Sequence, residues 1–163
     1  MCSATKVKYV DFHLDLNTET VDHAYPTEPL CVDPATPTRK VFATLESRKL
    51  GCALICSDGV LKGIFTERDA LKLMANNADL DVPISDYMVP DPVTLSSADS
   101  VGKAIAKMSF GGYRRLPIID EEGKPVGILK VRGILHYMVE HFPAVIYNLP
   151  PTPHHSTQKR EGA

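Results

Sequence analysis

A threonine and an aspartate three residues apart mark the junction between an apolar run and an expected helix. In the segment Gly63-Ile64-Phe65-Thr66-Glu67-Arg68-Asp69 the apolar residues end at Thr66, and Asp69 follows three positions later. This spacing is typical of a capping box, in which both side chains satisfy unpaired amides at the helix start. The pair also suits a ligand, because a carboxylate accepts hydrogen bonds from two ribose hydroxyls while the threonine and the helix amides face a phosphate. Spacing alone favours the cap, and the two functions can coexist.

Two adjacent arginines are the second feature with clear chemistry. Arg114 and Arg115 follow Tyr113 and precede the apolar residues Leu116 and Pro117. Most arginine pairs on a protein surface are simply solvated. The planar guanidinium nevertheless suits bidentate contacts with phosphate, so the position of this pair in the fold decides between the two interpretations.

The remaining reactive residue types form no recognisable catalytic set. Cys52 and Cys56 lie four residues apart in an apolar run and share one face of a strand, which is typical of core residues rather than of zinc ligands or disulfides. We interpret His136 and His141 as structural or solvated. His154 and His155 are also interpreted as solvated, and they offer at most a loose metal site. The sequence contains neither a Walker loop nor a dinucleotide-binding glycine motif. We therefore predict that the chain is not an enzyme and holds no metal.

Composition narrows the class of protein further. The 163 residues are 44% hydrophobic and 23% charged, with a net charge of −2. Such a chain can bury a core, but it lacks the basic character expected of a nucleic-acid binder. No apolar run approaches the roughly 20 residues that a membrane span needs, and the N-terminal residues lead into no signal-type apolar region. We expect a cytoplasmic protein with neither nucleic acid nor membrane as partner.

The elements that must position these side chains occur twice. The first segment recurs 64 residues later (127 minus 63) as Gly127-Ile128-Leu129-Lys130-Val131-Arg132-Gly133. Each half is predicted to contain an entry strand, a helix, a β-hairpin and a second helix. One such unit of about 55–60 residues would be marginally stable, so we expect two copies packed sheet to sheet with two related clefts. Arg114 and Arg115 would then lie across a cleft from Thr66, which favours the phosphate interpretation.

The first half begins within an extended, proline-rich stretch. Its predicted elements are, in order, a helix at 38–49, a strand at 52–56, a turn at 57–59, a strand at 60–65, a helix from 66 to about 76 and a linker at 79–87. We expect Thr38 to cap the first helix and Gly51 to end it. Leu71 and Met74 are expected to face inward from the second helix.

The second half follows the same order. Its predicted elements are an entry at 92–95, a helix stopped by Gly111-Gly112, a strand at 115–120, a turn at 121–124, a strand at 125–129 and a helix at 131–141. Ser97 or Asp99 is expected to cap its first helix. Ile134, Leu135 and Met138 are expected to face inward from the last one.

These features predict an α+β fold with four parts. Residues 1–28 form an N-terminal arm, in which a short strand at 7–12 is expected and which either docks or is partly disordered. Residues 29–87 form the first repeat with its linker, and residues 88–143 form the second. Residues 144–163 are predicted to be a flexible, proline-rich tail.

The arrangement resembles a tandem pair of cystathionine-β-synthase (CBS) domains, also called a Bateman module, over roughly residues 29–143. The motifs that carry the resemblance are the segment at 63–69, Leu116-Pro117-Ile118-Ile119-Asp120, and Met88 with Pro92-Val93-Thr94-Leu95. The resemblance implies two pseudo-symmetric repeats, each a small sheet flanked by two helices. It also implies a regulatory module, in a homodimer, that binds AMP, ADP, ATP or S-adenosylmethionine between the repeats and changes the conformation of a partner protein. Mg²⁺ would accompany ATP, and no cofactor would be tightly bound.

The resemblance also implies roles for particular residues. Thr66 would contact phosphate, and Asp69 would contact the ribose. The remaining ligand contacts implied by the resemblance are the phosphate-binding cations Arg114, Arg115 and Arg132, the residues Ile64, Phe65 and Val93 beside the adenine, and Pro117 next to the arginines. Thr36 and Pro37 would line the other cleft.

The second copy of the motif departs from the family pattern. Lys130 stands in place of the threonine and Gly133 in place of the aspartate, so the second cleft lacks a carboxylate for a ribose. Lys130 and Arg132 could instead add positive charge to the first cleft. We therefore predict one nucleotide per chain. The alternative is an interaction or scaffold module with unused clefts, in which the arm and the tail do the binding.

Overall fold

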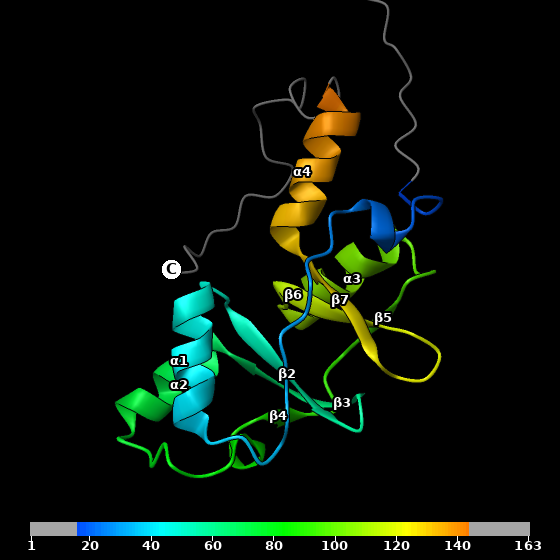
Figure 1. The fold of residues 1–163 in the computed structure, drawn as a ribbon. Helices are drawn as coiled ribbons and strands as arrows, with labels where there is room; N and C mark the ends of the chain where they lie inside the picture. The colour runs from blue at the N-terminus through cyan, green and yellow to red at the C-terminus, as the bar shows by residue number, and fades with distance from the viewer. Residues whose placement is uncertain (1–15, 144–163) are drawn as a thin grey trace, which may run out of the picture.

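The computed structural model describes residues 16–143, which form two small mixed sheets and four α-helices (Figure 1). The strand predicted at 7–12 and the tail with His154 and His155 lie outside the described residues. The first sheet has the order β1-β2-β3-β4, and the second has the order β5-β6-β7. The α+β fold class predicted from the sequence is confirmed.

The first sheet is built from four strands and carries two helices. Their bounds are β1 Cys31–Val32, α1 Thr38–Arg48, β2 Cys52–Ser57, β3 Val60–Thr66, α2 Glu67–Ala75 and β4 Val89–Pro90. Strands β2 and β3 form an antiparallel hairpin through Asp58 and Gly59. Both turn residues have a left-handed backbone, with φ of 51° and 79°, as a two-residue hairpin turn requires.

The second sheet repeats this order with one strand fewer. Its elements are β5 Leu95–Ser96, α3 Val101–Gly111, β6 Arg115–Ile119, β7 Pro125–Lys130 and α4 Val131–His141. Gly112 ends α3 with a left-handed backbone of φ 65°, as the sequence predicted. Two short 3-10 helices, η1 Val21–His23 and η2 Ile84–Asp86, precede the corresponding halves.

The N-terminal segment and the central linker occupy corresponding positions in the two halves. The linker strand β4 pairs with β3, with Gly63 opposite Pro90. The residues before β1 pair with β7 in the same way, because Thr27 and Ile128 exchange backbone hydrogen bonds of 3.0 and 2.9 Å. Val21 is buried in the core of the second half. Residues 20–27 therefore complete the second half, and the ribbon beside β6 and β7 in Figure 1 shows this path.

Three groups of buried side chains hold the fold together. One lies between the second sheet and its helices, and a second lies between the first sheet and α1 and α2. The third joins the two sheets, because Cys52, Leu54 and Cys56 of β2 pack against Ile128 of β7. Cys52 and Cys56 are thus buried core residues on one face of β2, as predicted, and both thiols are free.

Several capping predictions are wrong. Thr38 is the first residue of α1 rather than its cap, and its buried hydroxyl donates to the carbonyl of Val82 at 2.9 Å. The left-handed residue that ends α1 is Lys49 rather than Gly51. Helix α3 is capped by Ser100, whose Oγ accepts from the amide of Lys103 at 3.2 Å, and not by Ser97 or Asp99.

The inward residues of two helices are also predicted incorrectly in part. Leu71 and Met74 are 67% and 62% exposed, and Leu135 is 54% exposed. Helix α2 instead packs on its sheet through Ala70 and Leu73. In α4 the inward side chains are Ile134, Tyr137 and Met138, of which the first and the last were predicted. Apolar residues stand on both sides of these helices, so periodicity alone cannot select the buried face.

Phe65 offers a test of this core. It is fully buried and packs against Phe42, with ring centroids 5.7 Å apart. Truncating it removes aromatic contacts and leaves a cavity, so Phe65→Ala should lower the free energy of unfolding by about 3–5 kcal/mol. Urea denaturation checks this value. Phe110→Ala is the matched control, since Phe110 is 92% exposed and its loss should change stability by less than about 0.5 kcal/mol. Equal effects of the two variants would contradict the assigned core.

Candidate functional site

A cleft of about 570 Å³ lies between the two halves of the molecule. Three segments line it: residues from 64–72 in β3 and α2, residues from 89–93 in and after β4, and residues 112–117, which run from the end of α3 into β6. Its volume is within the range of about 300–1,000 Å³ typical of small-molecule sites. The walls include apolar side chains such as Val89 and Val93, and charged side chains from both halves.

Most of the residues singled out from the sequence line this one cleft. They are Ile64, Thr66, Asp69, Val93, Arg114, Arg115 and Pro117. The first three belong to the first half and the last three to the second, so the cleft joins residues that are far apart in the chain. The repeat predicted this proximity, because it implies that the hairpins of the two halves face each other.

Phe65 and Arg132 do not line the cleft. Phe65 is fully buried in the core below α1 and α2, because adjacent residues of a strand point to opposite faces and Ile64 faces the cleft. Arg132 is exposed in the first turn of α4. Lys130 also lies outside the lining, although its backbone is paired with that of Arg115 in the second hairpin. The structure thus does not bring Lys130 and Arg132 to the first cleft.

Thr66 and Asp69 form the helix cap expected from their spacing. Oδ2 of Asp69 accepts from the backbone amide of Thr66 at 3.1 Å and from its hydroxyl at 2.6 Å. Oδ1 lies 3.5 Å from Nζ of Lys72. In the second half, Lys130 stands at the start of α4 with no side-chain cap at all. A helix at this position therefore forms without the pair, which leaves room for a second function of Thr66 and Asp69.

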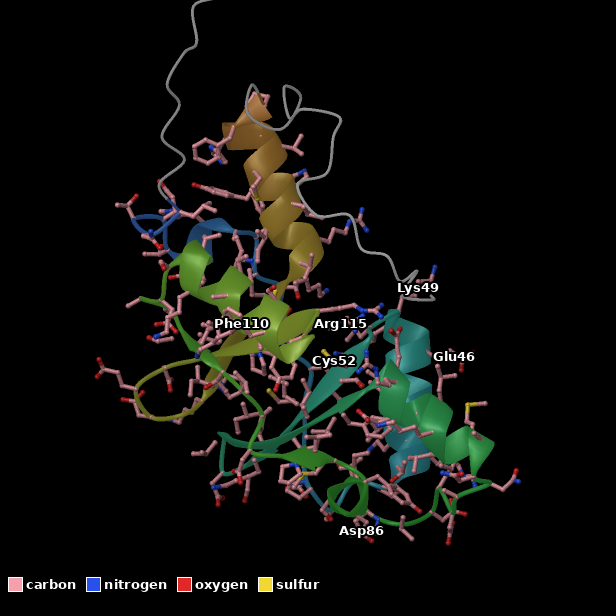
Figure 2. All side chains as sticks on the ribbon, turned by 180° about the vertical axis from the view of Figure 1, so that it is seen from behind. Glu46, Lys49, Cys52, Asp86, Phe110 and Arg115 are labelled. Carbon is pink, nitrogen blue, oxygen red and sulfur yellow. The ribbon has the colours of Figure 1, made fainter. Side chains whose placement is uncertain are left out.

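The two arginines differ in their surroundings. Nη2 of Arg115 lies 3.4 Å from Oε2 of Glu67, so this ion pair connects β6 of the second half with α2 of the first. Figure 2 shows Arg115 close to Cys52, at the junction of the halves. Burial raises the pKa of the Cys52 thiol, and the positive charges of Arg115 and Lys130 lower it in part. The guanidinium of Arg114 has no ion pair or hydrogen bond with any side chain of the described residues.

Sequence reasoning missed part of the lining. Asp91 and Tyr113 both line the cleft. The Asp91-Pro92 dipeptide signals a turn, and Asp91 has a positive φ of 46°, which is uncommon for a residue other than glycine. The ring of Tyr113 covers Gly111, where a Cβ would overlap it. Lys72 follows Asp69 by three residues, a helical spacing that predicts contact.

Comparison with known protein families decides what kind of module this is. The model of the CBS domain matches the chain twice, at residues 21–76 and 84–140. The chain belongs to the CBS-domain family. An uncharacterised 17.7 kDa protein of Acidianus ambivalens is 30% identical over 115 residues, which are 70% of each chain. Other relatives are longer: the matched part is 25% of a Methanocaldococcus jannaschii protein and 31% of the arabinose 5-phosphate isomerase GutQ of Salmonella typhi.

Solved structures share the fold of this CBS pair. A CBS domain protein of Pyrobaculum aerophilum, complexed with AMP, has a TM-score of 0.66 and 23% identity over 74% of this chain and 98% of its own. The CBS domain pair of protein MJ0100, in complex with 5′-methylthioadenosine and S-adenosyl-L-methionine, has a TM-score of 0.66 and 22% identity. The match covers 72% of this chain and 97% of that one.

The second half of the CBS pair differs from the first at the position of the missing aspartate. A Cβ on Gly133 would lie 2.5 Å from the carbonyl oxygen of Ala24 and 3.2 Å from that of Tyr25. The N-terminal segment thus packs directly against the helix where the first half carries Asp69. Thr36 and Pro37, which the sequence analysis expected to line a second cleft, instead contact the linker, since the carbonyl of Thr36 accepts from the amide of Ile84 at 2.9 Å.

Two further features of residues 16–143 bear on function. No group of three or more His, Cys, Asp or Glu side chains in this part of the chain is arranged to hold a metal ion. No helix in the same range has the length and apolarity needed to cross a membrane.

Substitution of Gly133 tests the packing of the N-terminal segment, because the direction of the change in stability is informative. In most helices Gly→Ala is stabilising by about 0.5–1 kcal/mol. At position 133 the new methyl group meets backbone oxygen atoms that cannot move aside easily, so Gly133→Ala should instead destabilise the protein by about 1–3 kcal/mol. Thermal unfolding monitored by circular dichroism measures the change. A higher melting temperature for the variant would show that the N-terminal segment does not pack there.

Proposed function

We propose that this CBS pair is a regulatory module that binds an adenosine-type ligand, AMP, ADP, ATP or S-adenosylmethionine, in the cleft between its halves. The observation that carries the proposal is the combination of groups around one cavity of about 570 Å³. A carboxylate comes from the first half, two guanidiniums come from the second, and apolar side chains lie between them. A nucleotide presents the matching ribose, phosphate and base.

The charges of the cleft suit each part of such a ligand. Oδ1 of Asp69 is not used by the cap and can accept hydrogen bonds from ribose hydroxyls, with Lys72 as its present neighbour. Arg114 has no side-chain partner among the described residues and can form a charge-assisted contact with phosphate. Ile64, Val93 and Pro117 offer apolar surface to the adenine. With ATP, Mg²⁺ would accompany the phosphates.

A ligand in this position provides a route for regulation. It would touch Asp69 of the first half and Arg114 of the second at once, so its binding energy would favour one arrangement of the halves over others. The relatives with AMP or with S-adenosylmethionine and 5′-methylthioadenosine support this ligand class. The match to part of GutQ supports a regulated enzyme as one kind of partner. In this proposal the chain senses a ligand and does not catalyse a reaction.

Calorimetric titration with AMP, ADP, ATP and S-adenosylmethionine tests the proposal directly. We expect one ligand per chain, because the second half lacks the carboxylate and its helix packs against the N-terminal segment. Two equivalent ligands per chain would contradict the assigned asymmetry. If none of the four ligands binds or raises the melting temperature, the proposal fails in favour of an interaction or scaffold module.

Asp69 should be the residue whose loss matters most for binding. Removing a charged hydrogen-bond partner costs about 1.5–3 kcal/mol, so Asp69→Ala should weaken ligand binding by about 10- to 150-fold. Calorimetry measures the affinity, and circular dichroism checks that the fold is retained. Asp86→Ala, an exposed carboxylate outside the cleft, is the control and should bind normally. If Asp69→Ala binds normally but melts at a lower temperature, the residue is only a cap.

We further propose that the module acts as a homodimer through exposed apolar side chains of its helices. Met74 of α2 and Leu135 of α4 are 62% and 54% exposed, and Val139 is also exposed on α4. Exposed apolar surface of this kind is typical of protein–protein contacts. Met74→Glu together with Leu135→Glu should therefore shift the mass in sedimentation equilibrium from dimer to monomer. The isosteric change Met74→Gln, which adds no charge, is expected to have a smaller effect. A monomeric wild-type protein would rule out this part of the proposal.

A further inference from the structure

The ion pair between Glu67 and Arg115 lies inside the proposed ligand cleft, and both residues line it. The pair is formed by one contact, with 3.4 Å between Nη2 and Oε2. That separation is longer than the roughly 2.7–2.9 Å of a strong charged hydrogen bond. The guanidinium is therefore held in position, but it is not saturated by this carboxylate.

The two members of the pair differ in their access to water. The side chain of Arg115 is only 29% exposed, whereas that of Glu67 is 65% exposed. Glu67 can leave the contact and return to water at little cost, because exposed ion pairs contribute little free energy. It is also the first residue of α2, where the helix dipole stabilises a carboxylate whether or not it is paired. Arg115 cannot compensate in this way, since most of its side chain is shielded.

Gly51 fixes where the guanidinium lies. A Cβ at position 51 would overlap Nη2 of Arg115 and would lie 3.0 Å from Oε2 of Glu67. The absence of a side chain on Gly51 therefore leaves the space in which Arg115 reaches from β6 across to the first half. The atom that an added methyl group would meet is the end of a flexible side chain, so it could be displaced without unfolding the protein.

We propose that Glu67 is a selectivity residue of this cleft: its carboxylate occupies Arg115, and a ligand binds by taking the place of Glu67 on that guanidinium. A phosphate group carries more negative charge than a carboxylate and matches the guanidinium in geometry, so it wins this exchange. An uncharged adenosine cannot compete, and neither can a ligand with a cationic sulfonium near this position. The ligand class is thus a phosphate-bearing adenine nucleotide rather than S-adenosylmethionine.

The exchange would also change how the two halves of the molecule contact each other. Glu67–Arg115 is a direct ion pair between α2 and the second sheet. When a phosphate replaces Glu67, the contact between the halves passes through the ligand, and a free carboxylate appears at the start of α2. The same helix carries the exposed Leu71 and Met74. Occupancy of the cleft therefore leaves an unpaired negative charge on the helix that carries Met74, a residue of the proposed dimer contact.

This inference rests on the proposed function, and its test measures the contribution of the phosphate alone. The quantity is the ratio of the dissociation constant of adenosine to that of AMP, from calorimetry on the full chain. Glu67→Gln frees Arg115 and should raise this ratio by about two- to fivefold, the amount expected for an exposed ion pair. Gly51→Ala pushes the guanidinium aside and should lower the ratio. Glu46→Gln, an exposed carboxylate on α1 outside the cleft, is the control and should leave it unchanged.

A double-mutant comparison tests whether Glu67 acts by occupying Arg115 or only by adding negative charge to the cleft. In an Arg115→Gln background, Glu67→Gln should no longer change the ratio, because the guanidinium for which it competes is gone. A gain that persists in that background, or no gain in the wild-type background, would overturn the inference. Binding of S-adenosylmethionine without binding of AMP would also overturn it while leaving the proposed function standing. If wild-type protein binds none of these ligands, the proposed function itself fails.

Discussion

The contact between the two sheets is the constraint on which the other features depend. Cys52, Leu54 and Cys56 of β2 pack against Ile128 of β7, and this small apolar group holds the hairpins of the two halves face to face. A single half of this size would bury little apolar surface and would be only marginally stable alone. Packing the sheets together solves that problem, and it also creates the cleft, because the helix starts and strand ends beside the shared core then converge from two sides.

The first half is completed by the linker that follows it in the chain, and the second half is completed by residues that precede the first. The linker provides β4 for the first sheet, and residues 20–27 provide the matching contact for the second. The two joins are similar in topology, and in the second one the backbone oxygens of Ala24 and Tyr25 approach Gly133. Glycine in place of aspartate at position 133 therefore removes a carboxylate, and it also leaves space for the backbone of the N-terminal segment. The repeat is symmetric in its fold and asymmetric in its chemistry.

In the first cleft one pair of side chains caps a helix, and in the proposed function the same pair also contacts the ligand. Thr66 and Asp69 cap α2 through Oδ2, which leaves Oδ1 toward Lys72 and the cleft. Helix α4 begins without any side-chain cap. The comparison of the two halves within one molecule therefore separates what the fold needs at this position from what it does not, which a single half could not do.

The order of elements, the repeat and most residues of the candidate site can be predicted from the sequence. The hairpin turn at Asp58 and Gly59 and the helix stop at Gly112 are local, because backbone conformation there depends on the residue itself. The grouping of Thr66 and Asp69 with Arg114 and Arg115 followed from the repeat, which predicted hairpins facing each other. The buried side of each helix or strand, in contrast, depends on packing in the tertiary structure. Leu71 and Leu135 are exposed and Phe65 is not, because neighbouring elements, rather than periodicity, select the covered face. The tertiary structure alone also showed that Glu67 reaches Arg115, since residues 48 positions apart (115 minus 67) meet through packing that no local pattern specifies.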